Sequence, residues 1–361
     1  MIERWKAYLK SISDFRQEGY YSDLWKGLIK EFEIKEDELP GIDRIVKQKC
    51  RGYNFEKINT RSAKFYNRIT ALYGGTLYNL KRFKEKFISS PFQRLSGRIK
   101  KQIAHLLIKS SREPIYDYHL FDARTIKLLK YLKHRSVKIE KYLQPLADEK
   151  KLVLTYNTLK TVYFFDKLLK NCGLSHHPEL SIFEIGAGTA NLAVLFGVHS
   201  LCKNYYIVDL PEMLLPASYE LYKYLPDAKQ FLPSEVGHEE EIRLDPDRIN
   251  YILLTPDQIS LIPDNSMDLV INIESFGEME QPVANKYVAA MYRVLRKNGY
   301  LFSANRESRI VSENNGVAYF TTYWKYPFLD SDEVILQEYC PMRDFVMGEK
   351  IRNINRLARK S

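Results

Sequence analysis

An acid, two glycines and a second acid follow one another in the middle of the chain at a spacing that suits a nucleoside ligand. Glu184 lies near the end of an apolar run and is followed by Gly186 and Gly188, and Asp209 comes 21 residues after Gly188. Glycines let the backbone approach a ligand closely, and a carboxylate can accept hydrogen bonds from both ribose hydroxyls. The pattern predicts a strand, a glycine turn, a helix and a second strand ending in a ribose-binding acid.

Two departures from the dinucleotide-binding pattern narrow the choice of nucleoside. Asn191 stands where that pattern has its third glycine, and Glu184 lies inside the first strand. A buried acid that faces the turn suits a cationic ligand better than a pyrophosphate. These residues resemble motif I of the class I S-adenosylmethionine-dependent methyltransferases, in which the acid before the glycines helps to hold the methionine end. The resemblance implies S-adenosyl-L-methionine as the cofactor.

The cofactor contacts expected from this reading come from four segments. Asp257 or Gln258, after the third strand, is expected at the amino edge of the adenine. The full set is Glu184, Gly186, Ala187, Gly188 and Asn191 around the turn, Asp209 and Leu210 after the second strand, Asp257 and Gln258 after the third, and Asn272 in the fourth.

The elements that must position these residues alternate between helical and extended patterns. The expected helices are 158–169, 190–199, 213–225 and 283–296, and the expected strands are 182–185, 205–208, 251–254, a buried run between 263 and 279, and 300–304. Two further β-like runs, 333–339 and 344–351, follow an irregular aromatic stretch, 310–327. This alternation predicts an α/β fold with a doubly wound, mostly parallel, Rossmann-like sheet and an antiparallel closing pair.

The N-terminal part has a different character. Apolar residues recur at helical spacing over 5–15 and 21–32, and the pattern continues to about residue 109. Residues 1–150 contain 33 Lys and Arg against 18 Asp and Glu, a net charge of +15, and the rest of the chain carries −5. We expect a basic, helical domain over 1–150, which binds the acceptor or a partner, and a methyltransferase domain over 151–361. Such a charge suits nucleic acid, an anionic membrane surface or a phosphorylated substrate, or is simply a solvated, lysine-rich surface.

Composition sets further bounds. Hydrophobic residues make up 45% of the chain and charged residues 28%, which is typical of a globular protein. No apolar run is long enough for a membrane span, and the first residues lack the basic and apolar regions of a secretory signal, so we expect a cytoplasmic protein. The four cysteines are widely spaced, which predicts buried thiols and neither a disulfide framework nor a zinc site.

Short segments carry a narrower resemblance. Residues 184–188, 206–212, 272–279, 305–306 and 326–328 resemble the sugar O-methyltransferase family of bacterial polysaccharide and glycoside gene clusters. Gly277 departs from that family, in which we expect Gln. The resemblance implies methyl transfer to a sugar hydroxyl of a surface glycan, a glycolipid or a nucleotide-sugar precursor, on an acceptor that is free, phosphorylated or lipid-linked.

Methylation of a sugar hydroxyl requires a group that removes its proton. Glu278 is the leading candidate for this base, because it follows the fourth strand at the edge where ligands bind, although a surface acid at a helix entry would look the same. Asn305 ends the next strand, and His119 lies in a loop that could line the acceptor pocket or simply lead into a helix. No ligand spacing demands a metal.

Two other functions stay open. An RNA methyltransferase would use the basic half as its nucleic-acid arm, although the Asn-Pro-Pro-Tyr type motif of amino-group methylation is missing after the fourth strand. A binding protein without catalysis would keep Gly186, Gly188 and Asp209.

Overall fold

The computed structural model describes residues 1–15, 23–50, 57–58, 116–117, 123–147, 151–174, 179–236, 242–314, 317–341 and 352–361. The chain divides into two compact units. One unit combines Met1–Arg51 with Lys167–Ser361, and the other is Gly52–Asp166. The compact units therefore do not divide at residue 150, where the sequence placed a domain boundary, because the first 51 residues pack with the C-terminal part of the chain.

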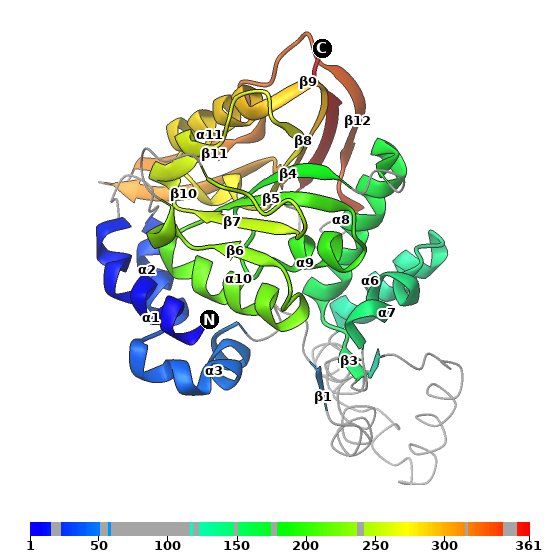
Figure 1. Ribbon diagram of the computed structural model, residues 1–361. Helices are drawn as coiled ribbons and strands as arrows, with labels where there is room; N and C mark the ends of the chain where they lie inside the picture. Colours follow the sequence, from blue (N-terminus) through cyan, green and yellow to red (C-terminus); the bar gives the residue numbers. More distant parts are fainter. Residues whose placement is uncertain are drawn as a thin grey trace, which may run out of the picture. The chain divides into compact units, whose positions relative to one another are not determined.

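An eight-stranded sheet forms the centre of the first unit (Figure 1). Its order is β12-β13-β9-β8-β4-β5-β7-β6. The strands from β9 to β6 in this order are parallel, and β13 runs antiparallel to both β9 and β12. The bounds are β4 Leu180–Ile185, β5 Cys202–Val208, β6 Lys229–Phe231, β7 Asn250–Leu254, β8 Met267–Ile273, β9 Leu295–Arg306, β12 Glu333–Tyr339 and β13 Asn353–Arg359. The mostly parallel sheet is confirmed. Its antiparallel closing pair consists of β12, which the sequence predicted, and β13, which it did not.

Helices cover both faces of this sheet, which explains why its central strands are almost continuously apolar. Phe183 and Ile185 of β4 point into a core that they share with Val288 and Met291 of α11 (Gln281–Val294). On the other face, Tyr205 of β5 packs against α9 (Asn191–Val198), and α10 (Pro211–Tyr224) lies beside α9. Each of these helices follows a strand that the sequence predicted.

The segment after β9 differs from the expectation. Residues 310–327, predicted to be irregular, contain a hairpin of β10 (Ser308–Asn314) and β11 (Val317–Thr322), followed by the short helix η9 (Tyr323–Lys325). The last strand is β13, whereas the predicted run 344–351 lies outside the described residues. Asn353 and Asn355 of β13 are buried, so polar residues at core positions hid this strand from a search for apolar runs.

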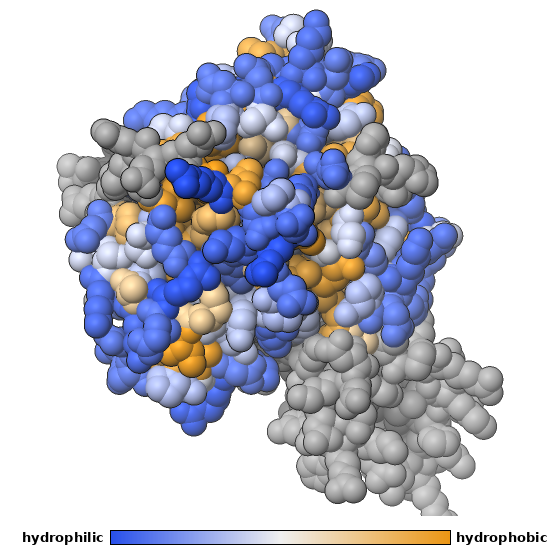
Figure 2. All heavy atoms as spheres, viewed as in Figure 1, coloured by the Kyte–Doolittle hydropathy of each residue, from blue (hydrophilic) through white to orange (hydrophobic). Residues whose placement is uncertain are grey.

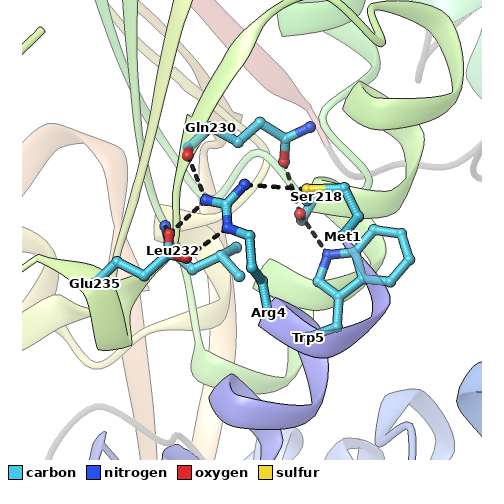
Figure 3. A network of polar contacts seen from close by, with 7 residues as sticks. All are labelled: Met1, Arg4, Trp5, Ser218, Gln230, Leu232 and Glu235. Carbon is cyan, nitrogen blue, oxygen red and sulfur yellow. Dashed lines mark hydrogen bonds and ion pairs between the residues drawn. The ribbon is translucent and has the colours of Figure 1, made fainter.

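The N-terminal helices belong to the first unit. They are α1 (Ile2–Ser11), η1 (Ile12–Phe15), α2 (Asp23–Phe32), η3 (Glu36–Gly41) and α3 (Ile42–Lys49). Figure 3 shows how α1 is fixed: the indole of Trp5 donates to Oγ of Ser218 over 2.8 Å, and Ser218 donates to Gln230 over 2.7 Å. In the same network Arg4 forms an ion pair with Glu235. Helix α1 is therefore bonded to α10 through Ser218 and to the segment around β6 through Gln230 and Glu235.

The second unit is described in part. Strand β3 (Lys151–Val153) lies between β1 (Lys57–Ile58) and β2 (Tyr116–Asp117). The helices α6 (Ala123–His134) and α7 (Ile139–Ala147) follow, and α8 (Tyr156–Cys172) begins in this unit. The helices expected between 55 and 109 lie outside the described residues.

Two further predictions concern the cysteines and membrane-spanning helices. All four cysteines are buried thiols, as predicted. In the part of the chain that the structure describes, no helix is long and apolar enough to cross a membrane.

Candidate functional site

The turn after β4 has a left-handed backbone at three positions. The φ angles are +73° at Gly186, +58° at Gly188 and +57° at Ala190. This backbone region costs a residue with a Cβ about 1–2 kcal/mol, and glycine avoids that cost. The turn brings the chain sharply from β4 into α9, which begins at Asn191.

The two glycines of this turn serve different purposes. A Cβ on Gly186 would lie 2.4 Å from both Cβ and Oγ of Ser275, so Gly186 allows the turn to pack against the segment after β8. A Cβ on Gly188 would have no atom within 4 Å. The space beside Gly188 is therefore open, at the carboxyl end of a central parallel strand, where ligands bind in sheets of this kind.

Asp209 faces the turn from the end of β5. Its Oδ2 accepts the backbone N–H of Gly188 over 2.8 Å, and its Oδ1 accepts the backbone N–H of Leu210 over 2.8 Å. Each carboxylate oxygen keeps a further lone pair for a ligand. Burial raises the pKa of Asp209 to about 7, the two backbone hydrogen bonds oppose this shift, and the charges of Glu278 and Glu212 add to it. The expected ribose-binding acid is thus fixed next to the open side of Gly188.

Glu184 is buried in β4, one strand away from Asp209. The hydroxyl of Tyr205 donates to its Oε2 over 2.7 Å. Burial raises the pKa of Glu184 to about 7, and the charge of Asp209 pushes it in the same direction, against the hydrogen bond from Tyr205. Two carboxyls with raised pKa values favour a cationic ligand, because a positive charge stabilises their ionised forms.

Gln258 and Asp257, the two residues predicted to contact the adenine, differ in burial and in hydrogen bonding. Gln258, in η7 (Pro256–Leu261), is buried: its Nε2 donates to the carbonyls of Pro233 and Val236 over 3.0 and 3.1 Å. Its Oε1 accepts the backbone N–H of Thr255 over 3.2 Å. Gln258 therefore builds the surrounding loop. Asp257 is half-buried, and among the described residues its Oδ1 has no hydrogen-bond partner, so Asp257 is the better candidate for the amino group.

Two buried amides hold the ends of three strands together. Nδ2 of Asn272, in β8, donates to the carbonyl of Ile185 at the end of β4 over 2.9 Å. Nδ2 of Asn305, in β9, donates to Oδ1 of Asn272 over 2.7 Å. Both side chains are fully buried. These hydrogen bonds support the turn, and the expected roles of Asn305 in catalysis and of Asn272 in cofactor binding stay predictions.

Glu278 lies in η8 (Phe276–Glu278), just beyond β8, and is held from two sides. Its Oε1 accepts from Nη1 of Arg309 over 2.7 Å, and its Oε2 accepts from the indole of Trp25 over 3.1 Å. About a quarter of the side chain, 26%, is exposed. The nearby Glu274 accepts from Nδ2 of Asn353 over 3.0 Å and has a φ of +61°. The two acids thus have separate partners, and Glu278 is the one whose charge acts on Asp209.

Trp25 and Arg309 were not among the predicted site residues. Trp25 lies in a helix whose aromatic residues have the spacing of ordinary core positions. Arg309 lies directly before the stretch 310–327, which was predicted to be irregular.

His119 lies outside the described residues, so its predicted role stays a prediction. Across the described ranges, no group of three or more His, Cys, Asp or Glu side chains could hold a metal ion.

Comparison with known proteins identifies the domain that carries this site. Residues 183–303 match the family described as "Methyltransferase domain". This range begins in β4, ends in β9, and contains the turn, Asp209 and Glu278. No significant match was found among curated proteins.

Solved structures with a similar fold include three methyltransferases. Magnesium protoporphyrin IX methyltransferase from Synechocystis PCC 6803, with bound S-adenosylhomocysteine, is 12% identical, with a TM-score of 0.37 and coverage of 56% of this chain and 82% of that one. A 1,6-didemethyltoxoflavin-N1-methyltransferase from Burkholderia thailandensis is 13% identical, with a TM-score of 0.39 and coverages of 66% and 88%. A SAM-dependent methyltransferase from Aquifex aeolicus is 18% identical, with a TM-score of 0.34 and coverages of 55% and 89%.

These similarities are too distant to assign an acceptor, and the assignment rests on the domain match together with the site. The chain contains an S-adenosylmethionine-dependent methyltransferase domain, and S-adenosylmethionine is its methyl donor. Three features of the site are compatible with this cofactor. No atom of the described residues lies within 4 Å of a Cβ placed on Gly188, and each carboxylate oxygen of Asp209 has a lone pair for a ribose hydroxyl. The raised pKa values of Glu184 and Asp209 suit a positively charged ligand.

Proposed function

We propose that this protein is an O-methyltransferase that acts on a sugar hydroxyl of a surface glycan, a glycolipid or a nucleotide-sugar precursor. The observation that carries the proposal is the way in which the segments resembling sugar O-methyltransferases meet around η8. Phe276 packs edge-on against Tyr326, with ring centroids 5.5 Å apart. A Cβ on Gly277 would lie 3.6 Å from Cβ of Arg306.

These contacts bring together, around Glu278, segments that are far apart in the sequence. Residues 272–279, 305–306 and 326–328 surround one short helix, which presents Glu278 at the carboxyl edge of the sheet. The resemblance therefore falls on the neighbourhood of the proposed base as well as on the cofactor turn, and this supports an acceptor related to those of the sugar O-methyltransferases.

S-adenosylmethionine supplies a methyl group on a positively charged sulfur. The residues of this chain have three tasks. Asp209 binds the ribose hydroxyls, and Gly188 leaves room for the cofactor. Glu278 takes the proton from the sugar hydroxyl, because two donors fix its carboxylate while each oxygen keeps a free lone pair.

A methyl-transfer assay with methyl-labelled S-adenosylmethionine tests this function. The acceptors are free sugars, nucleotide sugars, lipid-linked saccharides and RNA. We expect label in a sugar. RNA belongs in the panel because the net charge of +15 on residues 1–150 supports a second candidate, methylation of RNA. Label in RNA alone would contradict the sugar proposal, and cofactor binding without transfer to any acceptor would favour a binding protein.

A further inference from the structure

Arg309 has more hydrogen-bonding capacity than its visible contact uses. It lies in β10, and its Nη1 donates to Oε1 of Glu278 over 2.7 Å. A guanidinium carries five N–H donors in a planar fork. Within the described part of the chain, Glu278 is the partner of Arg309 in both its hydrogen bond and its ion pair. The side chain is 22% exposed, so its other donors have access to a ligand.

The position of Arg309 is fixed by the fold. Its partner across the hairpin is Thr321, which is buried and donates a hydrogen bond to the carbonyl of Met279, directly after η8. The backbone of Thr322 donates to Oε1 of Gln281 over 2.7 Å. The hairpin is therefore attached to the same loop that carries Glu278.

The outer side of this hairpin is apolar and exposed. Ile310 pairs with Phe320 across the strands, and they are 54% and 53% exposed. Neighbouring residues of a strand point to opposite faces, so Arg309 and Ile310 point in opposite directions. Figure 2 shows apolar side chains beside strongly hydrophilic ones in the region where β10 and α2 lie in Figure 1. The arginine thus turns away from this apolar surface and toward Glu278.

The charge of Arg309 excludes one role. The methyl donor is a cation, and two like charges close together repel each other. Glu278 balances one positive charge, but the unused donors of Arg309 still favour a negatively charged partner. The acceptor is the component of the reaction that can supply such a group.

We propose that Arg309 binds an anionic group, a carboxylate or a phosphate, on the sugar acceptor, close to the hydroxyl that Glu278 deprotonates. This inference rests on the proposed function and makes the substrate class more specific, to acidic or phosphorylated sugars. One guanidinium then holds both the base and the acceptor, and so sets which hydroxyl reaches Glu278.

A binding experiment tests this site without requiring turnover. The complex of the protein with S-adenosylhomocysteine is titrated with inorganic phosphate and with glucuronate, and binding is followed by calorimetry. Tryptophan fluorescence serves as a second readout, because Trp25 donates to Glu278. The variants are Arg309→Gln, Arg309→Lys and, as a matched control, Arg359→Gln, whose pair with Glu333 lies in β12 and β13.

We expect the native protein to bind one or both anions, Arg309→Gln to weaken this binding at least about tenfold, Arg309→Lys to lose less, and Arg359→Gln to match the native protein. The probe that binds more tightly distinguishes a carboxylate from a phosphate on the acceptor. An unchanged affinity for S-adenosylhomocysteine shows that each variant is folded. Equal anion binding in the native protein and Arg309→Gln, or no anion binding at all, would overturn the inference.

Kinetics separate this inference from the proposed function. The acceptors are methyl glucoside, methyl glucuronide and methyl glucoside 6-phosphate, which differ in charge at one position of the same ring. We expect Arg309→Gln to lower kcat/KM for every acceptor, because it removes a donor that fixes Glu278, and to lower it at least about tenfold more for the two anionic acceptors than for methyl glucoside. The same fold decrease in kcat/KM for methyl glucoside and for the anionic acceptors would overturn the anion site and leave the proposed function in place. Transfer to RNA alone would overturn the proposed function itself.

Discussion

The backbone N–H of Gly188 and the carboxylate of Asp209 are joined by a hydrogen bond of 2.8 Å. This bond connects the turn after β4 to the end of β5, and the second oxygen of Asp209 accepts from Leu210. The acid that is expected to bind the ribose is therefore also part of the framework of the turn. A change at Asp209 affects the ligand and the loop together.

Asp209→Ala should weaken binding of S-adenosylmethionine by at least about tenfold. It removes two charge-assisted acceptor positions for the ribose, each worth about 1.5–3 kcal/mol, and releases the N–H of Gly188. Calorimetric titration with S-adenosylmethionine, S-adenosylhomocysteine and NAD gives the affinities. Circular dichroism shows whether the variant is folded. An unchanged dissociation constant in a folded variant would place the ribose elsewhere, and tighter binding of NAD by the native protein would contradict the cofactor assignment.

Affinity for S-adenosylmethionine should increase from pH 6 to pH 8. Burial raises the pKa values of Glu184 and Asp209 to about 7, so both carboxyls are largely protonated at pH 6 and largely ionised at pH 8. A cationic ligand binds better to the ionised form, and one such carboxyl allows a change of up to about tenfold. Calorimetry at pH 6, 7 and 8 measures it. Glu184→Gln should flatten the profile, whereas the same slope in that variant would show that Glu184 does not contribute.

Glu184 and Asp209 should also make the stability of the ligand-free protein depend on pH, but with a decrease where the affinity for S-adenosylmethionine increases. Their ordinary pKa values lie near 4, so between about pH 4 and pH 7 the folded protein binds protons that the unfolded chain has released. The free energy of unfolding of the ligand-free protein should therefore fall as pH rises through this window. Urea titrations at pH 5 and pH 7 provide the comparison. Glu184→Gln should reduce the difference, and an equal fall in that variant would assign the effect to other groups.

The sequence predicted the geometry of the turn after β4 better than the contacts of Glu278, for a physical reason. Gly186, Gly188 and Asp209 belong to one local unit, in which strand, turn and helix follow from the nearby residues. The contacts of Glu278 come from Trp25 and Arg309, which are 253 and 31 residues away along the chain. Neither periodicity nor a motif predicts these long-range contacts, because they depend on how α2 and the hairpin pack onto the sheet.

Burial distinguishes three of the predicted site residues from the others. Gln258, Asn272 and Asn305 follow or end predicted strands, where ligand contacts are expected, yet their amides bond to the protein. From the sequence alone, a polar residue at a strand end looks the same whether it faces a ligand or a neighbouring carbonyl. The compact units were not predictable for a similar reason, since amphipathic helices α1 to α3 do not reveal which partner covers their apolar faces.

Alanine substitution should separate the two glycines of the turn. In Gly186→Ala the new Cβ would lie 2.4 Å from the side chain of Ser275, so the turn must shift, and both the melting temperature and the affinity for S-adenosylhomocysteine should fall. In Gly188→Ala the Cβ enters open space, so the free energy of unfolding should fall only by the backbone cost of about 1–2 kcal/mol, and the melting temperature should fall less than in Gly186→Ala. Its affinity should still fall, because the methyl group occupies space for the cofactor. Normal binding by Gly188→Ala would show that the cofactor does not approach this residue.

Trp5→Ala should destabilise the unit that contains the sheet. Trp5 is 1% exposed and bonds to Ser218 of α10, and truncation of a buried tryptophan costs about 3–5 kcal/mol. Trp324→Ala is the matched control, because that side chain is 57% exposed and its loss should cost far less. Urea denaturation measures both variants. Equal stability of Trp5→Ala and the native protein would mean that α1 does not contribute to folding of this unit.

Glu278→Gln should lower kcat for the sugar acceptor by about 10²- to 10⁴-fold, since the amide cannot accept the hydroxyl proton. The amide oxygen can still accept from Arg309, so the loop should keep its position and cofactor affinity should stay nearly the same. Glu274→Gln is the control: its oxygen can still accept from Asn353, and its turnover should change little. Loss of turnover in Glu274→Gln alone would move the base to Glu274. Normal turnover in both variants would remove the base from this loop and leave His119 as the residue to substitute next.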